Sequence, residues 1–138
     1  MSVGIKVDFL WYSIGTDEFL YSFFSTVAIR LEKGIWGTRF PIVMKELYSG
    51  ELNYTNCTLA YTEIMTIKKE LSELSPEFIV WDADDLTKKP PWDNEISKDI
   101  TSLGNYFITS DGRELIDVLL EAINEAKIEK VNLVIKKL

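Results

Sequence analysis

Apolar residues occupy every second position at the start of the chain: Val3, Ile5, Val7, Phe9 and Trp11. A period of two residues predicts a β-strand with one buried face, here over residues 3–11. The turn-forming residues 13–16 follow, and Thr16 or Asp17 can cap the helix that comes next. The chain therefore opens with a strand that leads into a helix.

Other stretches repeat their apolar residues every three or four positions, which predicts amphipathic helices. These helices lie between Asp17 and Gly34, from Pro41 to Tyr48, from Asn53 or Thr55 up to Pro76, and from Asp111 to Ala126. Three short runs rich in β-branched and aromatic residues favour strands. They cover residues 78–81, 106–108 and 131–135.

The resulting order is strand, three helices, strand, long loop, strand, helix, strand. This order predicts an α+β fold with a single mixed or antiparallel sheet of about four strands covered by about four helices. We expect one domain over residues 1–138, because no linker or repeat divides the chain. The final strand could pair within this sheet or across a homodimer.

Composition narrows the class of protein. With 46% hydrophobic and 12% aromatic residues, a chain of 138 residues can build a core without covalent links. The single cysteine, Cys57, allows no internal disulfide, as expected in the reducing cytoplasm. Lys6 and Asp8 interrupt the first apolar run, and no segment reaches the ~20 apolar residues that span a bilayer. We therefore expect a cytoplasmic protein without a signal peptide or membrane anchor.

The sequence also contains no histidine, which removes the commonest general base and the commonest metal ligand. We therefore expect a protein that is not an enzyme and that uses no cofactor. The formal charge of −7 disfavours nucleic acid and anionic membranes as partners and favours a basic protein. This charge is concentrated in residues 77–99, which hold seven acidic residues against three lysines.

Residues 81–112 form the most informative segment. They contain two tryptophans, two adjacent prolines and six aspartates, with little regular periodicity. Such a long loop in a small domain is typically functional or disordered, and its aromatic residues argue against disorder. We interpret it as an ordered acidic surface for recognition. The candidate partner-binding residues are Asp82, Asp84, Asp85, Trp92, Asp93, Glu95 and Asp99.

Each candidate also has a purely structural interpretation. The aspartates can cap turns and stay solvated, and Trp92 can anchor the loop on the core. Residues 81–85 lack the spacing of a calcium-binding loop, so we expect no metal site, although an enzyme that uses carboxylates with Mg²⁺ is one alternative function. A small-molecule-binding or scaffold module with an aromatic pocket around Trp11, Trp36 and Phe40 is another.

Several short motifs run through this region: residues 81–82 (WD), 85–87 (DLT), 90–92 (PPW), 96–100 (ISKDI), 103–107 (LGNYF) and 109–113 (TSDGR). Together with the residues at its start, they make the chain resemble a family of bacterial immunity proteins from polymorphic toxin systems. The resemblance covers roughly residues 2–125. It implies an α+β fold, a cytoplasmic location and non-catalytic binding to a cognate toxin domain, and it assigns no contact residues.

Overall fold

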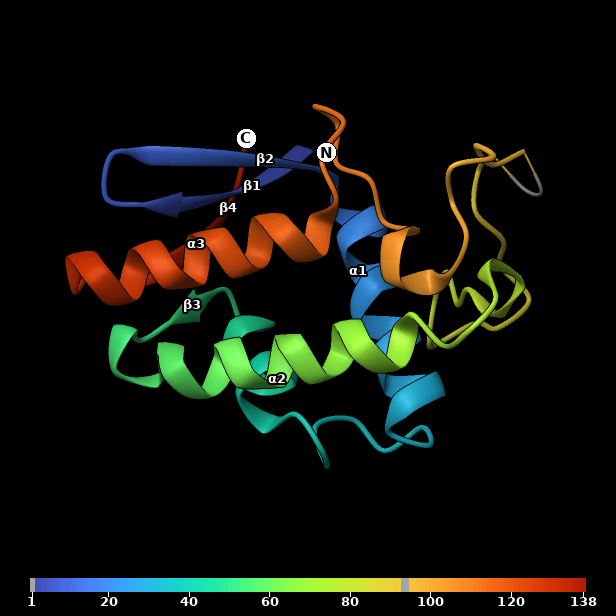
Figure 1. The fold of residues 1–138 in the computed structure, drawn as a ribbon, viewed down its shortest axis with the longest axis horizontal. Helices are drawn as coiled ribbons and strands as arrows, with labels where there is room; N and C mark the ends of the chain where they lie inside the picture. Colours follow the sequence, from blue (N-terminus) through green and yellow to red (C-terminus); the bar gives the residue numbers. More distant parts are fainter. Residues whose placement is uncertain (1, 93–94) are drawn as a thin grey trace.

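Four antiparallel strands form one sheet in the computed structural model, which describes residues 2–92 and 95–138. They are β1 (Ser2–Val7), β2 (Leu10–Thr16), β3 (Glu51–Leu52) and β4 (Leu133–Lys137). Their order across the sheet is β2-β1-β4-β3 (Figure 1). The C-terminal strand therefore pairs within the sheet, which is one of the two arrangements that the sequence left open. The predicted α+β fold with a four-stranded sheet is confirmed.

The first predicted strand is in fact a hairpin of two strands. Val7 pairs with Leu10 across a two-residue turn, in which Asp8 takes a positive φ of 54°. Phe9 lies at the tip with 94% of its surface exposed. The prediction of one strand over residues 3–11 is wrong because the alternation continues through a turn that contains neither glycine nor proline, the usual turn signals.

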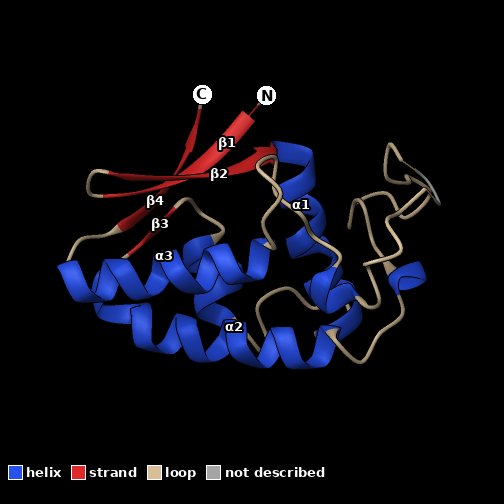
Figure 2. Cartoon of the chain, turned by 45° about the horizontal axis from the view of Figure 1, so that its top comes forward, coloured by secondary structure: helices blue, strands red, loops and turns tan. Residues whose placement is uncertain are grey.

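The helical segments are α1 (Asp17–Thr26), η1 (Val27–Leu31), η2 (Ile42–Leu47), η3 (Tyr54–Asn56), α2 (Cys57–Leu71), η4 (Pro76–Phe78), η5 (Leu103–Asn105) and α3 (Leu115–Glu129). Segments η1 and η2 are π-helical, and η3, η4 and η5 are single 3₁₀ turns. Helix α3 packs against the sheet, and α2 lies on the other side of α3 (Figure 2). Helix α1 follows directly after β2 and runs beside the sheet and the pair of helices α2 and α3 (Figure 2).

The apolar stripes predicted for these helices are buried, as the 3.6-residue period requires. Phe23 of α1, Ile64 of α2 and Leu119 of α3 are fully buried in one hydrophobic cluster. The hydroxyl of Thr16 accepts a hydrogen bond from the amide of Phe19 at 3.1 Å, which confirms the predicted helix cap. Within residues 2–92 and 95–138, no helix has the length and apolarity needed to cross a bilayer.

The strand predicted at residues 78–81 is absent from the sheet, so this prediction is wrong. Residues 78–81 pack on α1 instead, and the hydroxyl of Thr26 makes the backbone hydrogen bonds that a neighbouring strand would otherwise make. The Thr26 hydroxyl donates to the carbonyl of Val80 and accepts from its amide, both at 3.1 Å. Because one threonine replaces the neighbouring strand, Val80 is buried without a strand ladder, while Ile79 is half-buried.

The strand predicted at residues 106–108 is also wrong. Ile108 forms a single bridge with Glu114, where the chain turns back on itself through Gly112. The amide of Leu115 donates to the carbonyl of Phe107 at 2.8 Å, which ties the start of α3 to this turn. Helix α3 therefore begins at Leu115, four residues later than predicted.

Candidate functional site

Residues 81–92 and 95–112, which hold the predicted site apart from Asp93, form an irregular region at one end of the molecule (Figure 1). Trp81 is buried, and the ring of Trp92 meets it edge-on at a centroid distance of 5.4 Å. The indole nitrogen of Trp92 donates to the hydroxyl of Tyr106 at 2.8 Å. Burial raises the pKa of Tyr106, so its hydroxyl keeps its proton. These contacts anchor the loop on the core, and a contact of Trp92 with a partner stays a prediction.

The first two predicted aspartates already have partners within the protein. The carboxylate of Asp82 accepts the amide of Asp84 at 2.8 Å and lies 3.4 Å from the amine of Lys88. The carboxylate of Asp84 accepts the hydroxyl of Tyr21, from α1, at 2.8 Å. Burial, followed by this hydrogen bond, raises the pKa of Tyr21 to about 12. Tyr21 therefore remains a neutral donor that joins the acidic loop to α1.

The four remaining predicted acids of the loop differ in their surroundings. Asp85 accepts both the amide and the hydroxyl of Thr87, and these bonds lower the pKa of its carboxylate. Asp99 is exposed, and its carboxylate accepts the hydroxyl of Ser97 at 3.5 Å. Asp93 lies outside the described residues. Glu95 is exposed and lies beside a cavity.

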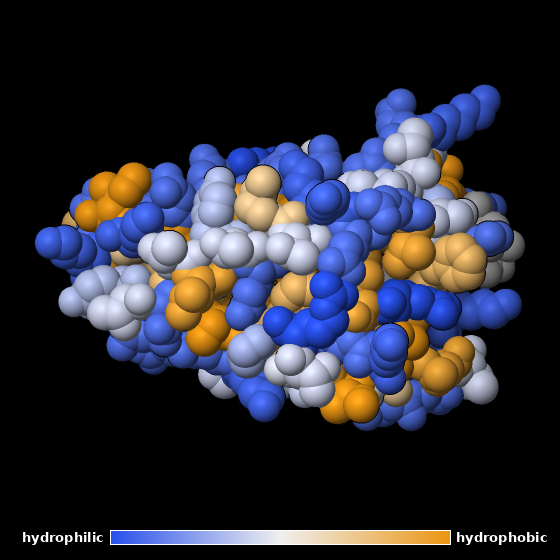
Figure 3. All heavy atoms as spheres, turned by 60° about the horizontal axis from the view of Figure 1, so that its bottom comes forward, coloured by the Kyte–Doolittle hydropathy of each residue, from blue (hydrophilic) through white to orange (hydrophobic). Residues whose placement is uncertain are grey.

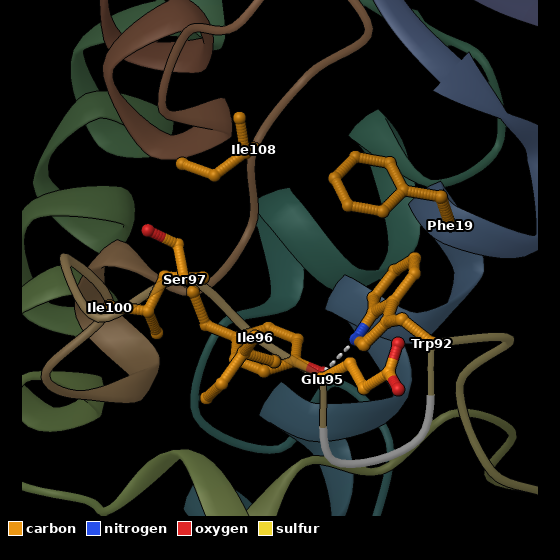
Figure 4. Close-up of a pocket in the computed structure, with 8 residues that line it drawn as sticks. Phe19, Trp92, Glu95, Ile96, Ser97, Ile100 and Ile108 are labelled. Atoms are coloured by element: carbon orange, nitrogen blue, oxygen red, sulfur yellow. Dashed lines mark hydrogen bonds between the residues drawn. The ribbon is translucent and has the colours of Figure 1, made fainter.

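This cavity has a volume of about 270 Å³ and is largely apolar (Figure 4). Glu95 contributes the one acidic side chain among the described residues that line it, which also include Phe19, Trp92, Ile96, Ser97, Ile100, Tyr106 and Ile108. The cavity therefore brings two of the predicted residues, Trp92 and Glu95, to one place. The other described candidates lie elsewhere on the loop.

A larger groove lies on the other side of α1 and was not predicted from the sequence. It has a volume of about 670 Å³ and is formed by α1, the turn after η2 and the ends of β1 and β4. Its lining residues are Val3, Asp17, Glu18, Leu20, Tyr21, Phe24, Tyr48, Ser49, Gly50, Ile135 and Lys137. We call this hollow the α1 groove. Tyr21, which holds Asp84, is one of these lining residues, so the acidic loop borders the groove.

Packed aromatic rings support the α1 groove from below. The ring of Tyr48 meets that of Phe24 at 5.0 Å and that of Trp36 at 4.9 Å, and Tyr21 stacks on Trp36 at 6.1 Å. The indole nitrogen of Trp36 is fixed by the carbonyl of Met44. Because each ring is held by its neighbours, Tyr21 and Tyr48 present defined surfaces to the groove. These residues are far apart in the sequence, so their assembly carries no local signal.

The aromatic pocket that the sequence predicted around Trp11, Trp36 and Phe40 does not form. Trp11 lies on the outer face of the sheet, where its indole covers Gly4 so closely that a Cβ there would meet the ring at 2.2 Å. Phe40 is buried in the core, and Trp36 belongs to the aromatic cluster of the α1 groove. The three aromatic residues predicted to share one pocket therefore lie in three different parts of the protein.

The face that carries α2 differs from these hollows. Its apolar side chains form separate islands among polar ones in Figure 3, which is typical of an ordinary protein surface. In the described part of the chain, no three acidic or cysteine side chains lie close enough to hold a metal ion. The hollows beside α1 are therefore the best candidates for a functional surface.

A small α+β protein with acidic and aromatic residues around open hollows has the features of a recognition protein. The sequence matches the family model of Immunity protein 70 over residues 5–135, so the chain belongs to this family of immunity proteins. This match confirms the resemblance seen in the sequence motifs. Among curated proteins and solved structures, none matches the chain.

Proposed function

We propose that the protein is a non-catalytic cytoplasmic inhibitor that binds and neutralises the toxic domain of a cognate protein from a polymorphic toxin system. The match to an immunity protein family over residues 5–135 carries this proposal. The charge of −7 supports a basic partner, because opposite charges accelerate encounter and suppress wrong pairings.

The acidic loop has the features of a surface that attracts such a partner. Asp82, Asp84 and Asp85 are held in fixed positions by hydrogen bonds, so they present their negative charge without losing further side-chain freedom on binding. The anchored ring of Trp92 keeps this loop in place. We include Glu95 and Asp99 in the same proposed surface, because both are exposed.

Co-purification tests this function directly. The tagged protein is mixed with the C-terminal domain of the secreted protein encoded by the neighbouring gene, and cells that express this domain are tested for rescue. A stoichiometric complex together with rescue is the expected result. Absence of both would refute the immunity function, and the alternatives of a small-molecule-binding module and of an enzyme would return.

A further inference from the structure

We propose that the α1 groove is the part of the surface that captures the toxin domain, and that its occupant is an arginine side chain from a basic patch of that domain. This inference rests on the proposed function and names the contact through which it acts. Its basis is the combination of an aromatic floor, an acidic rim and a volume of about 670 Å³.

The base of the groove suits an anchoring side chain from a partner. Phe24 and Leu20 are buried at its base, while Tyr48 keeps 44% of its surface exposed. Interfaces concentrate their binding energy where a large side chain of one partner fills a pocket of the other, and arginine is among the commonest such residues. The groove therefore has room for an anchor and a firm apolar base beneath it.

The rim supplies charge that the protein leaves unused. Asp17 and Glu18 lie in the first turn of α1, and neither carboxylate joins a hydrogen bond or ion pair with another described residue. Lys137 is the one basic side chain among the described lining residues. Asp84 adds a further carboxylate next to Tyr21. The groove is thus net negative and complementary to a cation.

Arginine fits this combination better than lysine. A guanidinium group is planar, stacks on aromatic faces and pairs with carboxylates through two parallel hydrogen bonds. The α1 groove offers both kinds of contact, because the tyrosines 21 and 48 lie in the same hollow as the carboxylates 17 and 18. A lysine amine has no planar face for such stacking and is more strongly hydrated.

Binding kinetics with matched variants test this inference. We compare the wild type with a rim variant, Asp17→Asn with Glu18→Gln, and with a floor variant, Tyr48→Ala, using the toxin domain encoded beside the gene. The control, Glu73→Gln with Glu129→Gln, removes the same charge from exposed positions that do not line the groove. We expect the rim and floor variants to bind about tenfold or more weakly, mainly through faster dissociation, and the control to stay within about twofold.

A second measurement identifies the occupant. Each surface arginine of the toxin domain is replaced by lysine, and the effect is measured with the wild type and with the rim variant. One arginine whose replacement weakens binding to the wild type, but no longer weakens binding to the rim variant, is the expected result. Thermal unfolding of each variant, together with the Tyr48→Phe variant that retains the ring, separates lost contact from lost folding.

The outcomes separate the inference from the function on which it rests. If folded rim and floor variants bind like the control while the wild type binds tightly, the groove inference is wrong and the immunity function stands. A wild type that neither binds nor rescues refutes both. A homodimer that dissociates in the Tyr48→Ala variant would assign the groove to a second copy of the chain and also contradict the inference.

Discussion

Two groups of carboxylates lie on or beside α1, and they differ in their hydrogen-bond partners within the protein. Asp82, Asp84 and Asp85 accept hydrogen bonds from an amide, a phenol and a threonine within the protein. Asp17 and Glu18 lie in the first turn of α1 without such partners among the described residues. The loop holds more carboxylates over a short stretch of sequence. The carboxylates in the first turn of α1, however, are the ones without hydrogen-bond partners among the described residues. Charge density along a chain therefore indicates where the field arises, and structure indicates which carboxylates remain free to bind.

The largest expected effect concerns the anchor that orders the loop. Replacing Trp92 with alanine removes its packing on Trp81 and its hydrogen bond to Tyr106, and we expect a loss of about 2–3 kcal/mol in the free energy of unfolding. Trp92→Phe retains an aromatic ring, so its expected loss is about 1 kcal/mol. Urea unfolding monitored by circular dichroism measures both values.

The opposite result would change the assignment of Trp92. If Trp92→Ala leaves the free energy of unfolding unchanged but abolishes toxin binding, the ring is a contact residue, as the sequence predicted. The acidic loop would then bind the toxin domain through Trp92, and its side chains could no longer be regarded as bound only within the protein.

The helical layers were predictable because their information is local. Apolar residues such as Ile64 and Leu119 repeat with the period of a helix, and burial of these stripes fixes how α2 and α3 pack. The sheet was less predictable. β3 has two residues and shows no period, and the run at residues 78–81 is satisfied by Thr26, which lies 54 positions away from Val80. A contact at that separation leaves no pattern in a single sequence.

The candidate site was predicted only in part, because some of its residues are neighbours in the sequence and others are not. The acidic loop is contiguous, so its charge and its aromatic residues were visible in the sequence. The α1 groove joins residues from both ends of the chain, such as Asp17, Tyr48 and Lys137. Tyr48 closes a short amphipathic helix and gives no sign of its neighbours Phe24 and Trp36. Only the fold brings these side chains together.

The second prediction tests the division of labour between the two groups of acids. Replacing Asp82, Asp84 and Asp85 together with asparagine weakens the field but keeps side chains that can accept hydrogen bonds. We expect association with the toxin domain to slow about three- to tenfold, its salt dependence to become weaker, and dissociation to change by less than about twofold. Stopped-flow measurements over a range of ionic strength give these rates.

The matched rim variant, Asp17→Asn with Glu18→Gln, should show the reverse pattern, with faster dissociation and a smaller change in association. Equal rate effects for the two variants would mean that the loop and the groove act as one surface. In that case, the hydrogen bonds that hold the loop acids would not remove them from direct binding.

The third prediction concerns the residue that joins the two regions. The pKa of Tyr21 is raised to about 12, first by burial and then by its hydrogen bond to Asp84. Because burial, the largest cause, is unchanged in this variant, we expect Asp84→Asn to lower this pKa only part of the way toward its ordinary value of 10.0. Carbon-13 spectra of tyrosine-labelled protein follow the ring directly, and the other tyrosines in the same spectra serve as internal controls.

The same linkage gives a pH dependence of stability. The folded protein holds the Tyr21 proton more tightly than the unfolded chain, so its stabilising contribution is complete below a pH of about 10 and is lost as the pH rises through about 12. The Asp84→Asn variant should lose a smaller contribution over this window. An unchanged titration of Tyr21 in the variant would show that the hydrogen bond to Asp84 does not persist in solution.

The smallest expected effect concerns stability at the groove. Acids in the first turn of a helix are stabilised by its dipole, so Asp17→Asn with Glu18→Gln should lower the free energy of unfolding by only about 0.3–1 kcal/mol at low salt. Thermal unfolding at low and high ionic strength measures this loss, and added salt should reduce it. A loss of several kcal/mol would mean that these carboxylates make structural contacts, as the loop acids do. A small loss, combined with weak toxin binding by the same variant, would identify Asp17 and Glu18 as acids whose charge serves recognition more than folding.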